Sequence, residues 1–283
     1  MKKLPWLFMI TLIITACQSE LKTVSEYEEA GKKAFFKEDY ETARKYLGRA
    51  VEMESSNRDI LYFLGISYQR EYMLDSALFY LKRADLLYPN DREVNVAIYP
   101  IAAELQEWEY AIRAIGALIQ TGDPIEKYRE RLADLNTKEG NLAGAYIHAT
   151  YLLEAEPDNP ERYFQLASLA NEIDSFNIAI ELMDEAIDKF EENDQFYLTK
   201  AIAHGRRGES KIAERILRPL AEADNSPAQY KYNLAWALSN QDSRQKKLEA
   251  YELFQQVVKE IPPDNVMDSI MTVLKDELYP DSL

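Results

Sequence analysis

Few residues of this chain have side chains suited to catalysis or metal binding. The 283 residues include one cysteine, Cys17, and two histidines, His148 and His204. A single cysteine excludes an intramolecular disulfide framework and argues against a thiolate metal cluster. The cysteine must therefore be interpreted from the residues around it, and the histidines from the elements that carry them.

The histidines occupy positions that mostly hold packing residues elsewhere in the chain. When the chain is aligned with itself at a spacing of 34 residues, apolar residues dominate both positions. The residues at the position of His204 are Tyr68, Ala102, Asn136, Ala170 and Leu238. The residues at the position of His148 are Tyr80, Ala114, Leu182 and Ile216. We therefore interpret both histidines as structural.

The sequence has no motif of a known catalytic or metal centre. It lacks a glycine-rich phosphate loop, a His-Glu-x-x-His pair, a calcium loop and a nucleophile elbow. The 49 acidic residues give no recognisable acid/base pair. We expect no catalytic residue, no metal and no cofactor, and an enzyme remains only the third functional possibility.

The charge narrows the range of partners. The formal net charge is −16, and the Arg206-Arg207 pair is too small a basic patch to offset it. An acidic surface repels nucleic acid and anionic lipid headgroups, so we expect no nucleic-acid partner.

Residues 58–91 show which elements carry these side chains. Leu61, Leu64 and Tyr68 fall on one helical stripe, and Ala77, Leu81 and Ala84 fall on a second. A break near residues 71–73 separates the two, and proline at residue 89 ends the second. The segment is therefore predicted to be a pair of amphipathic helices.

The same pattern returns along the chain. Steps of 34 residues from Ala77 meet alanine each time, and a further alanine follows after 37 residues. These alanines are Ala43, Ala77, Ala111, Ala145, Ala179, Ala213 and Ala250. The position of Gly65 is also small in all but one case, where Tyr99 stands. Small residues at both positions let paired helices approach closely, and the period predicts one continuous all-α array.

These residues resemble the tetratricopeptide repeat (TPR), a 34-residue helix–turn–helix unit. The resemblance rests on Leu61, Leu64, Gly65, Tyr68, Ala77, Leu81, Ala84 and Pro89. It implies a right-handed superhelical solenoid of about seven TPR helix pairs with a C-terminal capping helix over residues 265–283. The expected repeats are residues 24–57, 58–91, 92–125, 126–159, 160–193, 194–227 and 228–264. Pro100 and Pro219 fall inside expected helices and predict kinks.

The start of the chain predicts a secretory signal. Lys2 and Lys3 precede an apolar run over residues 4–16, which is shorter than the about 20 residues of a membrane span. Residues 14–17, Ile-Thr-Ala-Cys, resemble the lipobox of bacterial lipoproteins. That resemblance implies cleavage of residues 1–16, lipidation of Cys17 and a short tether over residues 17–23, most simply in the outer membrane. An ordinary signal peptide and an uncleaved anchor are the alternatives.

In the TPR family, the first helices of the pairs line a groove that binds a partner segment. Transferred to this chain, the resemblance places ten residues in such a groove: Phe35, Tyr62, Ile66, Gln69, Phe164, Asn171, Leu198, Ile202, Tyr232 and Trp236. Their aromatic and aliphatic members predict two apolar sub-sites separated by the acidic fourth repeat. The alternative is that some of them pack against neighbouring repeats.

Two functions follow from these expectations. The first is a lipid-anchored scaffold that binds protein partners, such as envelope membrane proteins or peptide segments, as an accessory subunit of an envelope assembly or secretion machine. The alternative is a surface lipoprotein that captures a ligand or nutrient for an uptake system.

Overall fold

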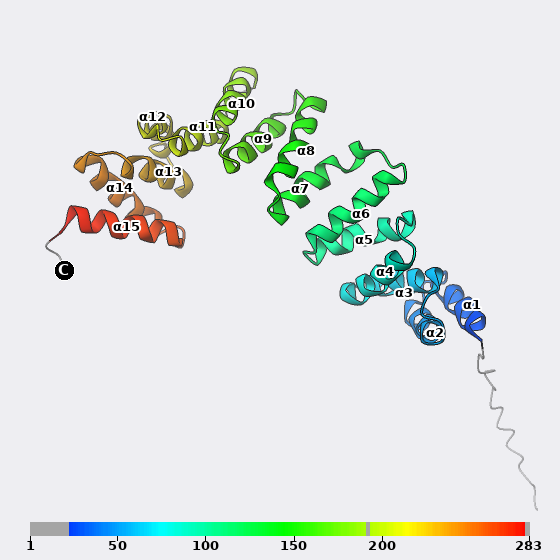
Figure 1. Ribbon diagram of the computed structural model, residues 1–283. Coiled ribbons are helices and arrows are strands. Elements are labelled where there is room, and N and C mark those ends of the chain that lie inside the picture. The colour runs from blue at the N-terminus through cyan, green and yellow to red at the C-terminus, as the bar shows by residue number, and fades with distance from the viewer. Residues whose placement is uncertain (1–22, 191–192, 281–283) are drawn as a thin grey trace, which may run out of the picture. The chain divides into compact units, whose positions relative to one another are not determined.

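The computed structural model describes residues 23–190 and 193–280, and every regular element within them is helical. The predicted signal peptide (residues 1–16), Cys17 and residues 18–22 of the tether lie outside the described residues. None of the described helices is long and apolar enough to cross a membrane. The chain is an all-α solenoid whose helices form two compact units, one ending at Gly122 and one beginning at Asp123 (Figure 1).

The first unit contains three helix pairs, in which the members of each pair pack against one another. Its helices are α1 (Val24–Phe35), α2 (Tyr40–Met53), α3 (Arg58–Arg70), α4 (Leu74–Leu87), α5 (Arg92–Glu104) and α6 (Trp108–Gln120). We call α1, α3 and α5 the first helices and α2, α4 and α6 the second helices. Successive pairs are joined by contacts between α2 and α3 and between α4 and α5.

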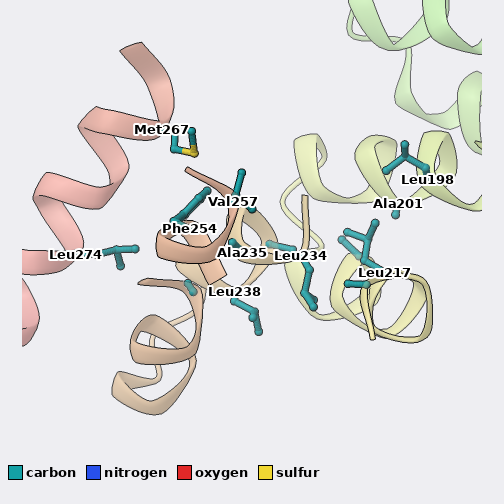
Figure 2. Close-up of a cluster of buried hydrophobic side chains, with 14 of the residues drawn as sticks. Leu198, Ala201, Leu217, Leu234, Ala235, Leu238, Phe254, Val257, Met267 and Leu274 are labelled. Atoms are coloured by element: carbon teal, nitrogen blue, oxygen red, sulfur yellow. The ribbon is translucent and has the colours of Figure 1, made fainter. Parts of the chain in front are cut away.

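The second unit continues with a short 3-10 helix and nine α-helices. They are η1 (Ile125–Tyr128), α7 (Arg129–Glu139), α8 (Leu142–Ala155), α9 (Pro160–Glu172), α10 (Phe176–Lys189), α11 (Asp194–Arg206), α12 (Ser210–Ala221), α13 (Ala228–Ser239), α14 (Arg244–Val257) and α15 (Asn265–Leu278). One buried cluster runs through α11 to α15 (Figure 2). Met267, Leu274 and Leu278 attach α15 to this cluster, and each is at most 3% exposed.

The repeated alanines are the most deeply buried feature common to both units. All seven, from Ala43 to Ala250, are at most 1% exposed. Gly31 and Gly65, from the other small position, are buried directly against leucines of the second helices. Their lack of side chains is what allows the paired helices to approach so closely.

Most of the first helices begin after a capping residue, and the fourth repeat departs most from this pattern. Before α1, α3, α5, α9 and α11, a capping side chain accepts a hydrogen bond from the first helical turn. These caps stand in the 34-residue register: Thr23, Asn57, Asp91, Asn159 and Asn193. The same register holds Pro227 in the seventh repeat, where α13 begins without a side-chain cap, and Ile125 in the fourth repeat, whose side chain cannot cap. Here the chain forms η1, and α7 begins only at Arg129.

Neither internal proline ends its helix. Helix α5 runs through Pro100 to Glu104, and α12 runs through Pro219 to Ala221. Both prolines are exposed, so their rings lie on the outer faces of these helices.

Candidate protein-binding surface

Five aromatic residues at the ends and middle of α1, α2 and α3 form the most conspicuous surface feature of the first unit. We call Phe35, Phe36, Tyr40, Tyr62 and Phe63 the aromatic cluster. The ring centroids of Phe35 and Phe63 are 5.0 Å apart, and those of Phe36 and Phe63 are 5.7 Å apart. Both pairs are edge-on, the arrangement that aromatic quadrupoles favour. Phe36 nevertheless remains 72% exposed.

The other two rings of the cluster, Tyr40 and Tyr62, support Phe35 and Phe63. Phe35 also packs edge-on against Tyr40 of α2, and Tyr62 packs edge-on against Phe63. Because Phe36 follows the last residue of α1, its backbone N–H still bonds to carbonyls of the last helical turn. An exposed aromatic ring on a fixed backbone loses little conformational entropy when it enters a partner's pocket.

Two cations lie over rings of the cluster. Lys32 Nζ lies 5.2 Å from the ring centroid of Phe63, and the Arg58 guanidinium lies 4.7 Å from that of Tyr62. Both distances suit cation–π attraction. The rings are thus bounded by charge on one side and open to solvent at Phe36.

The same two cations belong to a chain of ion pairs that crosses the first helices. Lys32 Nζ lies 2.6 Å from Glu28 of α1 and 2.7 Å from Asp59 of α3. Arg58 of α3 lies 2.8 Å from Asp91, which caps α5. The hydrogen bond from Lys32 lowers the pKa of Asp59 against the opposing effect of burial. Each single pair contributes little at a surface, but the network fixes the register of three helices.

The arrangement of rings and cations is suited to binding a protein segment rather than to catalysis. Large rings and fixed cations can hold a segment of another protein, since aromatic anchors typically dominate interface energetics. Within the described residues, no group of three His, Cys, Asp or Glu side chains could hold a metal ion.

Only some residues of the aromatic cluster were predicted from the sequence as groove residues. Phe35 and Tyr62 belong to the cluster, and Gln69 lies half-buried at the end of the same helix α3. Ile66 is 7% exposed, so its expected exposure to a groove is wrong. Its side chain belongs to the packing between helix pairs and is not available as an anchor.

In the predicted sub-site of the second unit, Leu198 is core, whereas Ile202, Tyr232 and Trp236 are half-buried. Leu198 is fully buried in the cluster of Figure 2. Ile202, Tyr232 and Trp236 pack against the same cluster. The expected exposure of Leu198 is wrong because α11 packs against α9, α10, α12 and α13 at once. The Trp236 ring lies against Gly205, where an added Cβ would come within 2.7 Å of the ring.

The other two predicted groove residues of this unit, Asn171 and Phe164, differ in their exposure to solvent. Asn171 is 4% exposed and donates a hydrogen bond to the Thr199 carbonyl, so its expected exposure is also wrong. Phe164 is half-buried and lines a cavity of ≈ 430 Å³ between the starts of α9 and α11. It is one of four predicted residues of this unit that remain partly exposed, with Ile202, Tyr232 and Trp236.

Phe36 and Phe63 were not among the groove residues predicted from the sequence. A signal for both was present: Phe36 forms a Phe-Phe pair with Phe35 at the end of the first expected helix, and Phe63 follows Tyr62. A helical stripe selects one residue of each adjacent pair. Phe36 lies just past the end of α1, where the stripe no longer applies, whereas Tyr62 and Phe63 lie within α3 and both join the cluster.

The two histidines are buried or half-buried. His204 is 7% exposed, and its Nδ1 lies 2.6 Å from Oε2 of Glu209. His148 is half-buried, and burial, with a smaller effect of Arg129, lowers its pKa. Neither histidine therefore lies in a group of side chains suited to metal binding within the described residues.

Comparison with known proteins supports the fold. No protein-family model and no curated protein matches the chain. Among solved structures, a chain of the Naa15/Naa10 complex bound to HypK-THB has 13% identity and a TM-score of 0.53 over 89% of this chain. This chain spans only 39% of that one.

Two further structures have lower scores. A tetratricopeptide repeat protein from Parabacteroides merdae has 16% identity and a TM-score of 0.48, and covers 89% of this chain and 98% of its own. Yeast Tom70 has 18% identity and a TM-score of 0.46, and covers 91% of this chain and 55% of its own. At such identities, structural similarity concerns the fold and not the activity.

Proposed function

We propose that the chain is a scaffold that binds a segment of another protein through the aromatic cluster of α1–α3. The observation that carries this proposal is the state of Phe36, which is 72% exposed while its ring packs edge-on against Phe63. Leaving a phenylalanine in water has no benefit for folding, and large exposed apolar groups commonly mark interaction sites.

We further propose that the scaffold is lipid-anchored at Cys17 in the outer membrane. The support is the lipobox-like Ile-Thr-Ala-Cys sequence and the basic, apolar leader before it. Acyl chains contribute about 0.8 kcal/mol per buried methylene, so more than one chain gives a durable anchor. Residues 18–23 reach about 20 Å at most, which would keep α1 and the aromatic cluster near the bilayer.

The partner that suits this position is a membrane protein of the envelope or a segment passing close to the membrane. The chain would then act as an accessory subunit of an envelope assembly or secretion machine, holding a partner in place. No cofactor or nucleic acid takes part in this function.

The proposal is tested by affinity purification from membranes after mild cross-linking. Wild type, Phe36→Ala and the matched control Phe79→Ala are compared, because Phe79 is also exposed (56%) but lies on α4. A discrete set of partners lost only with Phe36→Ala supports the proposal. Partners retained by all three proteins would overturn it.

The anchor is tested separately with Cys17→Ala. We expect this variant to leave the membrane fraction and to lose mass corresponding to its acyl chains. A Cys17→Ala protein that stays membrane-bound would contradict lipid anchoring but not binding by the aromatic cluster.

A further inference from the structure

A hollow of ≈ 750 Å³ lies between the second helices α4 and α6, apart from the aromatic cluster. We call it the α4–α6 hollow. Its apolar wall includes Leu86 of α4 and Ile112, Gly116 and Ala117 of α6. Leu86 is 79% exposed, and a Cβ added at Gly116 would meet no atom within 4 Å. The hollow is therefore open space that an apolar side chain can enter.

The other end of the hollow is polar and ordered. Tyr110 donates a hydrogen bond of 2.9 Å to Asp85, and the Arg113 guanidinium lies 3.0 Å from the same carboxylate. The Tyr110 ring lies between Arg113, 3.9 Å from its centroid, and Lys82, 4.3 Å away. Burial and the bond to Asp85 raise the pKa of Tyr110, so it stays protonated and donating at neutral pH.

Arg113 is the most exposed cation at this end, because Lys82 is paired with Glu107. The Asp85 side chain is only 14% exposed, whereas that of Arg113 is 60% exposed and that of Lys82 is 31% exposed. These three are the charged residues that line the hollow. An exposed guanidinium thus lies beside an apolar wall. Its complement is a group that carries an apolar side chain and a carboxylate.

We propose that the α4–α6 hollow is a second docking surface, for a protein segment that inserts an apolar side chain above Gly116 and pairs a carboxylate with Arg113. A protein segment fits better than a small molecule because a pocket for a small ligand buries most of its surface. Here Leu86 and Arg113 remain largely in solvent. This surface is independent of the aromatic cluster, which lies on different helices.

The chain supplies a matched control for blocking the hollow. Gly48 of α2 stands two 34-residue periods before Gly116, and a Cβ there also meets no atom within 4 Å. Gly116→Phe fills the hollow, whereas Gly48→Phe makes the same change on a second helix elsewhere. Arg113→Gln removes the cation, and Lys45→Gln is its control because exposed Lys45 holds the same register position in α2.

The probe is a random-peptide phage library selected on the full wild-type chain. We expect enriched peptides that pair an aliphatic or aromatic residue with Asp or Glu. Synthetic versions should bind Gly48→Phe and Lys45→Gln as they bind wild type. Their affinity should fall about tenfold or more for Gly116→Phe and Arg113→Gln, as for the loss of an anchor contact.

Three outcomes overturn the proposal: no enriched acidic–apolar peptide, enriched peptides that are basic, or binding that Gly116→Phe leaves unchanged. Phe36→Ala separates the two surfaces. Peptides lost with Phe36→Ala but not with Gly116→Phe belong to the aromatic cluster and are counted as unchanged binding in the third outcome only if every enriched peptide behaves in this way. Thermal melts followed by circular dichroism should be the same for Gly116→Phe and Gly48→Phe.

Discussion

Gly65 of α3 and Leu81 of α4 are in such close contact that a Cβ on the glycine would lie 2.7 Å from Cγ of the leucine. One period earlier, Gly31 and Leu47 repeat the relationship at 2.6 Å. Both leucines are fully buried. The helix pair is therefore assembled around a leucine of the second helix that occupies the place of a missing side chain on the first.

This relationship predicts opposite effects for two glycine substitutions. Gly65→Ala should destabilise the fold, because overpacking of about 1–3 kcal/mol exceeds the roughly 1 kcal/mol gained in helix propensity. Gly48→Ala should stabilise it by about 0.5–1 kcal/mol, since its Cβ position is open. The measurement is urea unfolding followed by far-UV circular dichroism. Equal effects of the two substitutions would show that the close contact is not limiting.

The pairing of helices could be predicted from the sequence because it depends on local, periodic residues. The 34-residue alanine register corresponds to positions that are at most 1% exposed in both units. The irregular fourth repeat was not predictable from the missing cap alone, because Ile125 and Pro227 both stand where five repeats hold a capping residue, yet α13 begins directly after Pro227. The division after Gly122 was not predicted, since the alanine period continues across it.

Leu198 gives a test of burial in the second unit. Leu198→Ala should lower the free energy of unfolding by about 2–5 kcal/mol, the usual effect of removing a fully buried leucine side chain. Phe36→Ala should change it far less, because Phe36 is 72% exposed. Denaturant unfolding of both variants makes the comparison. A small effect of Leu198→Ala would mean that this side chain is not core.

The groove residues were predicted less well than the pairing of helices, and the reason is physical. A helical period shows which residues share a face, but not how far neighbouring helices cover that face. Leu198 is covered because α11 packs against helices on several sides. Phe36 is exposed because it lies just past the end of α1, where the helical stripe no longer applies.

The surroundings of Glu214 predict that the free energy of unfolding decreases at acid pH. Burial opposes its ionised form, but hydrogen bonds from Lys246, Arg218 and Gln241 outweigh this and lower its pKa from 4.5 to about 2. A carboxylate with a lowered pKa in the folded state stabilises that state above its unfolded pKa. This stabilisation should be lost as the pH falls from about 4.5 toward 2.

The corresponding measurement is unfolding of wild type and Glu214→Gln across that pH range. The stability difference between them should shrink as the pH falls. Glu252→Gln, which alters an exposed carboxylate of α14, is the control and should follow wild type. A Glu214→Gln difference that stays constant with pH would show that the charge of Glu214 does not contribute.

The most direct test of the central claim is site-specific photo-cross-linking from position 36. A photoreactive phenylalanine analogue is placed at residue 36 or, as control, at residue 79 of the full chain, and cells are irradiated. We expect a discrete protein adduct from position 36 that is absent from position 79 and weakened by Phe63→Ala. No adduct from position 36, or the same adducts from both positions, would contradict binding by the aromatic cluster.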